Sequence, residues 1–116
     1  MFGYISPVAQ GRLRVSHRKV DKAKSTNYRP YHTHLKSDYA PLTPGEVVKV
    51  EVEFWPMTAL VPAGCQLRLD IQPYEPCGTG PFPHEYDTSF RIGATNSLYT
   101  GPDHVSYIQL PIIPQQ

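Results

Sequence analysis

Thirteen prolines and eight glycines punctuate this chain of 116 residues. Proline removes a hydrogen-bond donor from a helix interior, and glycine is a poor helix former, so no long uninterrupted helix fits between them. The eight tyrosines suit strands and half-buried surfaces. A chain of this length is enough for one domain. We therefore expect residues 1–116 to form a single, all-β domain.

Alternating apolar and polar residues identify the expected strands. The clearest is VVKVEVEFW, in which Val48, Val50, Val52 and Phe54 lie on one face and charged residues lie on the other. The same two-residue period marks residues 11–17 and 66–71, and the tail supplies a short strand around Leu98 and a final strand over residues 105–110. Strands without helices predict a sandwich or a barrel.

Proline and glycine place the turns between these strands. LTPGE, residues 42–46, has Pro44 and Gly45 at its centre, in the order that a type II turn favours. VPAGC (residues 61–65) and the pair Gly101-Pro102 predict two further turns.

The charge pattern gives no reason to expect nucleic acid or an anionic membrane as a partner. Eleven basic residues balance ten acidic ones, for a formal net charge of +1. Residues 17–30 carry five basic side chains against the single acid Asp21, which predicts a solvated loop. The alternative is a basic patch that binds a partner. No apolar run approaches the roughly 20 residues that cross a bilayer, and the first residues lack the pattern of a signal peptide.

Self-contained hydrolysis finds no support in the sequence. The G-x-S-x-G motif that presents a nucleophilic serine does not occur. Ser16 and His17 are adjacent, and adjacent side chains of a strand point to opposite faces, which is wrong for a proton relay. The segment GTGPFP opens no helix, so it does not resemble a phosphate-binding loop. We expect no catalytic residue and no cofactor in this chain.

The pair His32 and His34, in YRPYHTHLKSDY, is the main candidate for metal chemistry. Residues two apart on an extended chain share a face, and paired imidazoles occur in many zinc and copper sites. Zinc needs three or four converging ligands, and the residues that could complete the set are His17, His84, His104, Asp38 and Glu85. Because two ligands specify nothing about the rest, we predict no metal. We expect both imidazoles to form local hydrogen bonds or to belong to a contact surface.

Carbohydrate binding is a further alternative, because β-sandwiches can present aromatic side chains on loops. The side chains that could stack on a sugar ring are Trp55, Tyr74, Tyr86 and Tyr99. Aromatic residues at strand ends more often belong to a core or an interface, which is the interpretation we prefer.

The cysteine content adds little to these alternatives. Cys65 and Cys77 permit one disulfide at most, and a reduced pair fits as well. The sequence does not determine their redox state, and it leaves the compartment open while slightly favouring the cytoplasm.

Three segments carry an ordered set of motifs: GRLRVSHRK (residues 11–19), LTPGEVVKVEVEFWPMTALVPAGCQLRLDI (42–71) and LYTGPDHVSYIQLPIIP (98–114). Together they resemble the C-terminal domain of X-Pro dipeptidyl-peptidase and cocaine-esterase-like hydrolases. In that family a G-x-L-R-x-S-x-R strand precedes a P-G-E turn, an alternating strand, a G-x-x-L-R-L-x-I strand and a tail like S-x-x-x-L-P. The matching positions are Gly11, Leu13, Arg14, Ser16, Arg18, Pro44, Gly45, Glu46, Gly64, Leu67, Arg68, Leu69, Ile71, Ser106, Leu110 and Pro111, with Phe82-Pro83 as a further similar pair.

The resemblance implies a jelly-roll β-sandwich of the galactose-binding-like type. In the family this domain is non-catalytic, packs against an α/β-hydrolase domain that carries the Ser-Asp-His triad, and helps to wall the active site. The implied function is therefore that of an accessory module of a serine hydrolase, with the hydrolase domain as its partner in the same chain or another. The alternative is a stand-alone β-sandwich that binds carbohydrate or another small ligand.

The sequence departs from the family's pattern in one respect. The family's domain usually begins several strands before the G-x-L-R segment, whereas only ten residues precede Gly11 here. We expect a sandwich that lacks its N-terminal strands, with exposed sheet edges that a second copy or a partner could cover. The residues expected at an interface or in a pocket wall are Tyr31, His32, His34, Trp55 and His84.

Overall fold

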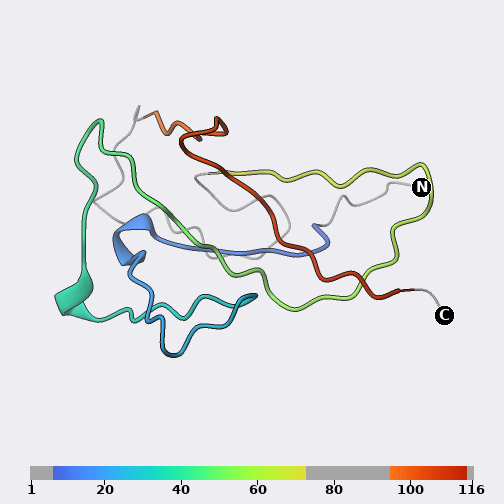
Figure 1. Cartoon of the computed structure of the whole chain (residues 1–116), viewed down its shortest axis with the longest axis horizontal. Helices are drawn as coiled ribbons and strands as arrows, with labels where there is room; N and C mark the ends of the chain where they lie inside the picture. The colour runs from blue at the N-terminus through green and yellow to red at the C-terminus, as the bar shows by residue number, and fades with distance from the viewer. Residues whose placement is uncertain (1–6, 73–94, 115–116) are drawn as a thin grey trace, which may run out of the picture. The chain divides into compact units, whose positions relative to one another are not determined.

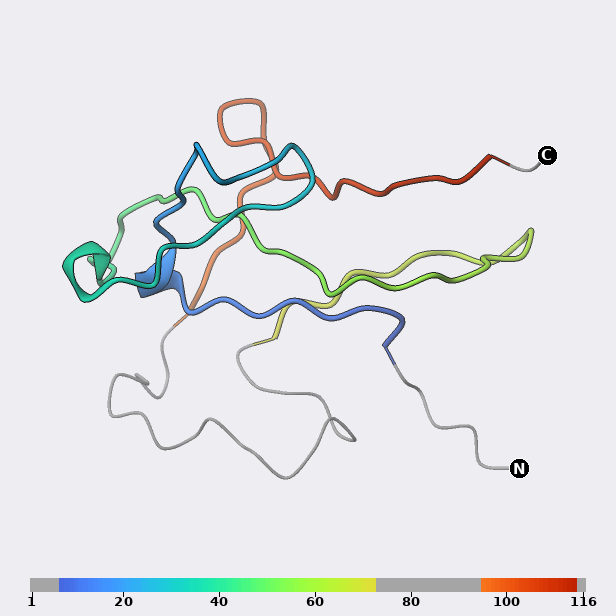
Figure 2. The same cartoon turned by 90° about the horizontal axis from the view of Figure 1, so that it is seen from below.

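The computed structural model describes residues 7–72 and 95–114 (Figures 1 and 2). Contacts divide the chain into two compact units, Met1–Gly64 and Cys65–Gln116, and each is described by itself. Several residues of interest in the sequence lie outside the described residues: Tyr74, Cys77, Phe82, Pro83, His84, Glu85 and Tyr86.

The first unit contains two short 3₁₀ helices, η1 (Val15–His17) and η2 (Lys36–Asp38), which are the coiled ribbons of Figure 1. In η1 the amide of His17 donates to the carbonyl of Arg14 at 2.8 Å. In η2 the amide of Asp38 donates to the carbonyl of Leu35 at 3.0 Å. Single turns of this kind are common connectors, so both helices act as corners between extended segments.

The strand expected over residues 11–17 is interrupted by η1. Its first part alternates as predicted, because Arg12 and Arg14 are exposed while Leu13 and Val15 are half-buried. The chain then turns so that residues 16–18 can bond to residue 40. The amide of Ala40 donates to the carbonyl of Ser16 at 2.9 Å, and the Arg18 guanidinium donates to the carbonyls of both Ala40 and Val15. His17 therefore lies in a corner and not on a strand face.

Two isolated antiparallel bridges are the β-pairing seen among the described residues. One joins Gly11 to Phe54 and is extended by a bond of 2.8 Å from the amide of Trp55 to the carbonyl of Gln10. The other joins Val20 to His32. The described residues do not form a named strand, and the jelly-roll β-sandwich stays a prediction.

The basic stretch after η1 doubles back on itself as a loop, here called the clasp loop, residues 18–34 (Figure 1). On either side of the Val20–His32 bridge, the amide of Asp21 donates to the carbonyl of Tyr31 at 2.8 Å, and that of Thr33 to the carbonyl of Lys19 at 3.2 Å. The hydrogen bonds give this solvent-facing loop a defined shape.

The predicted turns are confirmed. Gly45 has φ of +84°, the left-handed value that the third position of a type II turn requires, and the amide of Glu46 donates to the carbonyl of Thr43 at 3.0 Å. Gly64 has a similar φ of +85°. In the second unit the amide of His104 donates to the carbonyl of Gly101 at 3.2 Å.

The second unit, as far as it is described, consists of extended chain around the turn at Gly101. The hydroxyl of Ser106 donates to the carbonyl of Tyr99 at 2.6 Å, and the Tyr99 ring meets that of His104 edge-on, with the centroids 5.4 Å apart. These contacts fix the short turn between the two extended segments.

None of the described residues is buried. The alternation of residues 48–54 nevertheless has a structural consequence within the first unit. Glu51 and Glu53 are half-buried, whereas Val50, Val52 and Phe54 remain 41%, 41% and 38% exposed. Val48 is half-buried and Lys49 is exposed, so both faces of this segment are only partly covered. No helix in the described ranges is long and apolar enough to cross a membrane.

Candidate functional site

A hollow of about 250 Å³ lies on the first unit, beside the returning arm of the clasp loop. Its lining consists of Arg29, Pro30, Tyr31, His32, His34 and Glu53. Three residues that the sequence predicts for an interface or pocket wall, Tyr31, His32 and His34, thus line one concave surface. Their neighbours at this surface are an arginine and a glutamate.

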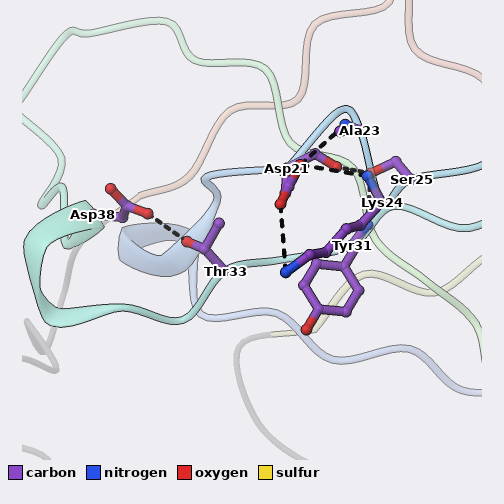
Figure 3. Close-up of polar contacts among 7 residues, drawn as sticks. All are labelled: Asp21, Ala23, Lys24, Ser25, Tyr31, Thr33 and Asp38. Atoms are coloured by element: carbon purple, nitrogen blue, oxygen red, sulfur yellow. Dashed lines mark hydrogen bonds and ion pairs between the residues drawn. The ribbon is translucent and has the colours of Figure 1, made fainter.

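Asp21 and Ser25 set the position of the arm that carries Tyr31 (Figure 3). The Asp21 carboxylate accepts from the amides of Ala23 at 3.0 Å and Lys24 at 3.4 Å. The Ser25 hydroxyl donates to the carbonyl of Asp21 at 2.7 Å and accepts from the amide of Tyr31 at 2.9 Å. Aspartate and serine make such bonds to nearby backbone readily, so the local sequence specifies this turn.

The ring of Tyr31 has a cation next to it. The ammonium group of Lys24 lies 5.2 Å from the centroid of the Tyr31 ring, within the range of a cation–π contact. Lys24 also pairs with the Asp21 carboxylate at 3.8 Å. The basic residues of the loop are therefore partly engaged with its own aromatic and acidic groups.

His32 is fixed by the segment that the clasp loop covers. Its Nε2 atom lies 2.8 Å from the carbonyl oxygen of Glu51. A carbonyl can only accept, so Nε2 carries a proton and donates it. The other ring nitrogen, Nδ1, is buried and has no hydrogen-bond partner among the described residues. His32 is thus oriented by one nitrogen while the lone pair on the other is unused.

His34 lies between two other imidazoles. Its ring centroid is 5.7 Å from that of His32 and 5.6 Å from that of His17. Its φ of +50° is left-handed, which is uncommon for a residue other than glycine. The Thr33 hydroxyl donates to the Asp38 carboxylate at 2.7 Å, and this bond ties the backbone beside His34 to η2 (Figure 3).

An ion pair closes one side of the hollow. The Nε atom of Arg29 lies 2.9 Å from Oε1 of Glu53, with the two side chains 64% and 34% exposed. This pair joins the tip of the clasp loop to the polar face of residues 48–54. The hollow therefore presents neutralised charge alongside two imidazoles and a phenol.

No three histidine, cysteine, aspartate or glutamate side chains within residues 7–72 and 95–114 are arranged to hold a metal ion. Of the residues proposed to complete a site with His32 and His34, Asp38 accepts from Thr33 and His104 packs on Tyr99 in the second unit. The ring of His17 does lie next to that of His34, with the centroids 5.6 Å apart. His84 and Glu85 lie outside the described residues.

The aromatic residues considered for sugar binding are not brought together in the described part of the chain. Trp55 does not line the hollow; it is 63% exposed, with the Arg12 guanidinium 5.5 Å from its ring centroid. Tyr99 belongs to the second unit, and Tyr74 and Tyr86 lie outside the described residues.

Sequence reasoning missed Arg29, Pro30 and Glu53 as lining residues of the hollow. The basic loop and the charged face of residues 48–54 are both visible in the sequence, but the pairing of one arginine with one glutamate depends on how the loop folds back. Ser16 Oγ, in turn, is buried without a partner in the described part and is therefore not hydrogen-bonded to His17.

The hollow is lined by polar and aromatic side chains, and its lining residue from residues 48–54 is Glu53, on the charged face of that segment. Residues 3–109 match the model of the X-Pro dipeptidyl-peptidase C-terminal non-catalytic domain. The chain is a member of that family, which confirms the resemblance found in its sequence motifs.

Two curated proteins are similar to almost the whole chain. They are named "Putative serine esterase Mb1866c", from Mycobacterium bovis (strain ATCC BAA-935 / AF2122/97), and "Putative serine esterase MT1883", from Mycobacterium tuberculosis (strain CDC 1551 / Oshkosh). Each is 27% identical over 114 residues, covering 96% of this chain and 17% of the relative. The chain thus spans about a sixth of the length of these relatives. No solved structure gave a significant match.

Proposed function

We propose that this chain is the non-catalytic C-terminal β-sandwich module of a serine hydrolase of the X-Pro dipeptidyl-peptidase or esterase type. Its role is to pack on an α/β-hydrolase domain and to shape the substrate pocket of that domain. The observation that carries the proposal is the family match over residues 3–109, and the partly exposed apolar face of residues 48–54 supports it.

The geometry of the first unit suits a packing role. The clasp loop covers the polar side of residues 48–54 through His32 and Arg29, which bond to Glu51 and Glu53. The apolar side chains of Val50 and Phe54 keep about two-fifths of their surface in water. Burying apolar surface stabilises a contact by about 25 cal/mol per Å². The remaining strands of the jelly roll and the hydrolase domain are the partners that we propose for this face.

The hollow suits a pocket-shaping role. Tyr31, His32 and His34 line it with one phenol and two imidazoles, and Arg29 and Glu53 form a charge-neutral pair at its side. Such a surface offers hydrogen bonds without a strong charge preference. Against a catalytic domain it would contribute a polar wall to the substrate pocket.

Co-purification tests the packing. The chain is expressed together with the α/β-hydrolase segment encoded in the same reading frame, or in the neighbouring one, and a stable complex is expected. Val50→Lys places a charge on the apolar face and should lower the yield of complex at least about tenfold. Leu60→Lys changes a side chain of the first unit that is already 82% exposed, and it should leave the yield unchanged.

Two outcomes would contradict the proposal. One is a hydrolase domain that neither binds the chain nor changes its substrate preference when the chain is present. The other is an equal loss of complex in the Val50→Lys and Leu60→Lys proteins. A homo-oligomer that uses the same face would appear in light scattering of the chain alone, and Val50→Lys would convert it to a monomer.

A stand-alone ligand-binding module is the second candidate, and the hollow is the observation that favours it. Glycan-array binding by the isolated chain, lost on Tyr31→Ala and retained on Trp55→Ala, would support this candidate over the first. Trp55 serves as the control because it is exposed but does not line the hollow.

A further inference from the structure

We propose that Arg12 and Arg14, each stacked on an exposed aromatic ring, form a docking surface for an acidic segment of a partner protein. The segment that fits is an extended chain with an aspartate or a glutamate at every second position. This arginine surface consists of Arg12, Arg14, Tyr39 and Trp55, none of which lines the hollow. The inference concerns the first unit and does not depend on the identity of the hydrolase domain.

The two arginines lie on the same side of an extended segment. Arg14 has φ of −76° and ψ of 118°, and both arginines are exposed while Leu13 and Val15 are half-buried. Because extended chain advances about 3.3 Å per residue, the backbones of residues 12 and 14 are separated by about 7 Å. The same separation and the same facing apply to alternate residues of an extended partner, so one acidic side chain can meet each arginine.

Each guanidinium of the arginine surface lies next to a ring from a different part of the chain. That of Arg12 is 5.5 Å from the centroid of the Trp55 ring, and that of Arg14 is 6.0 Å from the centroid of the Tyr39 ring. The two aromatic residues are 63% and 45% exposed. Tryptophan, tyrosine and arginine are the residues most enriched among those that dominate binding at protein interfaces.

Backbone hydrogen bonds position both rings. The amide of Trp55 donates to the carbonyl of Gln10 at 2.8 Å, which brings the tryptophan beside the segment that carries the arginines. Tyr39 precedes Ala40, whose amide donates to the carbonyl of Ser16 at 2.9 Å. The stacking partners are therefore in place before a ligand arrives, and restrained arginines lose less conformational entropy on binding.

Stacking on a ring leaves an arginine able to bind a carboxylate. The guanidinium is planar and has five N–H donors in its plane, whereas its contact with an aromatic ring does not consume them. Arg12, for example, also donates from Nη2 to Oε1 of Gln10 at 3.4 Å. A bond to a partner's carboxylate is thus compatible with the stacking and with the bonds that the two arginines already make.

The charge of the first unit favours an acidic partner. Residues 1–64 contain nine lysines and arginines against five aspartates and glutamates. Each of these carboxylates already bonds within the unit: Asp21 to Lys24, Asp38 to Thr33, Glu46 to Arg18, Glu51 to Lys49 and Glu53 to Arg29. The surplus of basic charge attracts an acidic segment and steers its approach.

An acidic protein segment fits this surface better than a nucleic acid does. Single-stranded nucleic acids bind by stacking their bases on open aromatic faces along a positively charged groove. In the arginine surface both rings already have a guanidinium next to them, and the surface supplies two cations and not a long basic track. We therefore commit to a protein segment as the occupant.

The fluorescence of Trp55, the single tryptophan of the chain, reports binding at the surface directly. The probe is a synthetic peptide of alternating glutamate and serine, titrated into the full chain. A saturable change in emission is expected, with a Kd that rises at least about fivefold between about 20 mM and about 200 mM salt. A peptide of alternating lysine and serine should produce no saturable change.

Substitutions separate the stacked arginines from charge in general. Arg12→Gln and Arg14→Gln should each raise the Kd at least about threefold, and the double substitution about tenfold or more. Arg12→Lys keeps the charge but loses the planar fork, so it should stay at least about twofold weaker than the unmodified chain. Lys22→Gln is the matched control, because it removes one exposed basic residue of the same unit, and it should change the Kd less than about twofold.

Three outcomes would overturn the proposal. The first is the absence of a saturable change in Trp55 emission with the acidic peptide. The second is an equal weakening by Lys22→Gln and by both arginine substitutions, which would mean that overall charge and not this surface attracts the peptide. The third is tighter binding of an oligothymidylate with the same charge, which would identify the surface as one for nucleic acid.

Discussion

Arg29 and Glu53 lie far apart in the sequence, and in the structure the Nε atom of the arginine is 2.9 Å from a carboxylate oxygen of the glutamate. The pair links the tip of the clasp loop to the segment that carries the partly exposed apolar face. Together with the bond from His32 to the carbonyl of Glu51, it explains why the polar side of residues 48–54 faces the loop. The contact ties the clasp loop to the charged side of that segment.

The Arg29–Glu53 pair should contribute little to stability, because both side chains are partly exposed. A double-mutant cycle with Arg29→Gln and Glu53→Gln, read from the exchange of the Arg29 amide, should give a coupling of about 0.2–1 kcal/mol. The coupling should vanish in about 1 M salt, where screening is strong. The same cycle on the more exposed pair Arg68 and Asp70 should give a smaller value. A coupling above about 2 kcal/mol at the first pair would contradict this account.

Gly11 lies against the backbone of Glu53, the residue before its bridge partner Phe54. A Cβ atom at this position would overlap the carbonyl oxygen of Glu53, and backbone cannot move aside as a flexible side chain can. Gly11→Ala should therefore separate the two segments and speed exchange of the Trp55 amide, which donates to Gln10, about tenfold or more. Gly101→Ala is the control, since nothing lies within 4 Å of its Cβ position. Equal exchange in the Gly11→Ala protein and the unmodified chain would show that the bridge does not form.

Local chemistry accounts for what the sequence predicted correctly. A proline followed by a glycine defines the turn at Pro44 and Gly45 without help from distant residues, and the observed φ of Gly45 agrees. The family was recognisable for a related reason, because its motifs combine turn residues with alternating strands in a fixed order, and the match over residues 3–109 confirms it.

Long-range contacts account for what the sequence could not show. The strand expected over residues 11–17 ends in η1 because Ser16 and Arg18 bond to Ala40, a residue that no pattern near η1 reveals. The row of three imidazoles likewise depends on the folding back of the clasp loop. His32 and His34 were visible as a pair, but the approach of His17 to His34 follows from the turn at η1.

The hydroxyl of Thr33 holds the backbone beside His34 to η2. Thr33→Val keeps the shape of the side chain and removes its bond of 2.7 Å to the Asp38 carboxylate. Losing a part-buried hydrogen bond to a charged group costs about 1.5–3 kcal/mol, so exchange of the Thr33 amide should rise at least about tenfold. Thr58→Val, in an exposed segment of the same unit, should leave that amide unchanged. A similar effect from both substitutions would mean that the Thr33 hydroxyl does not anchor the loop.

The turn requires glycine at position 45 because of its backbone conformation, and not because a side chain would lack room there. Nothing lies within 4 Å of its Cβ position, but its φ of +84° is one that a residue with a side chain adopts at a cost of about 1–2 kcal/mol. Gly45→Ala should therefore raise the exchange rate of the Glu46 amide, which closes the turn, by about fivefold to thirtyfold. Gly45→Asn should have a smaller effect, because asparagine enters the left-handed region more readily. If alanine and asparagine behaved alike, the effect would have a cause other than backbone conformation, and the turn would not be of type II.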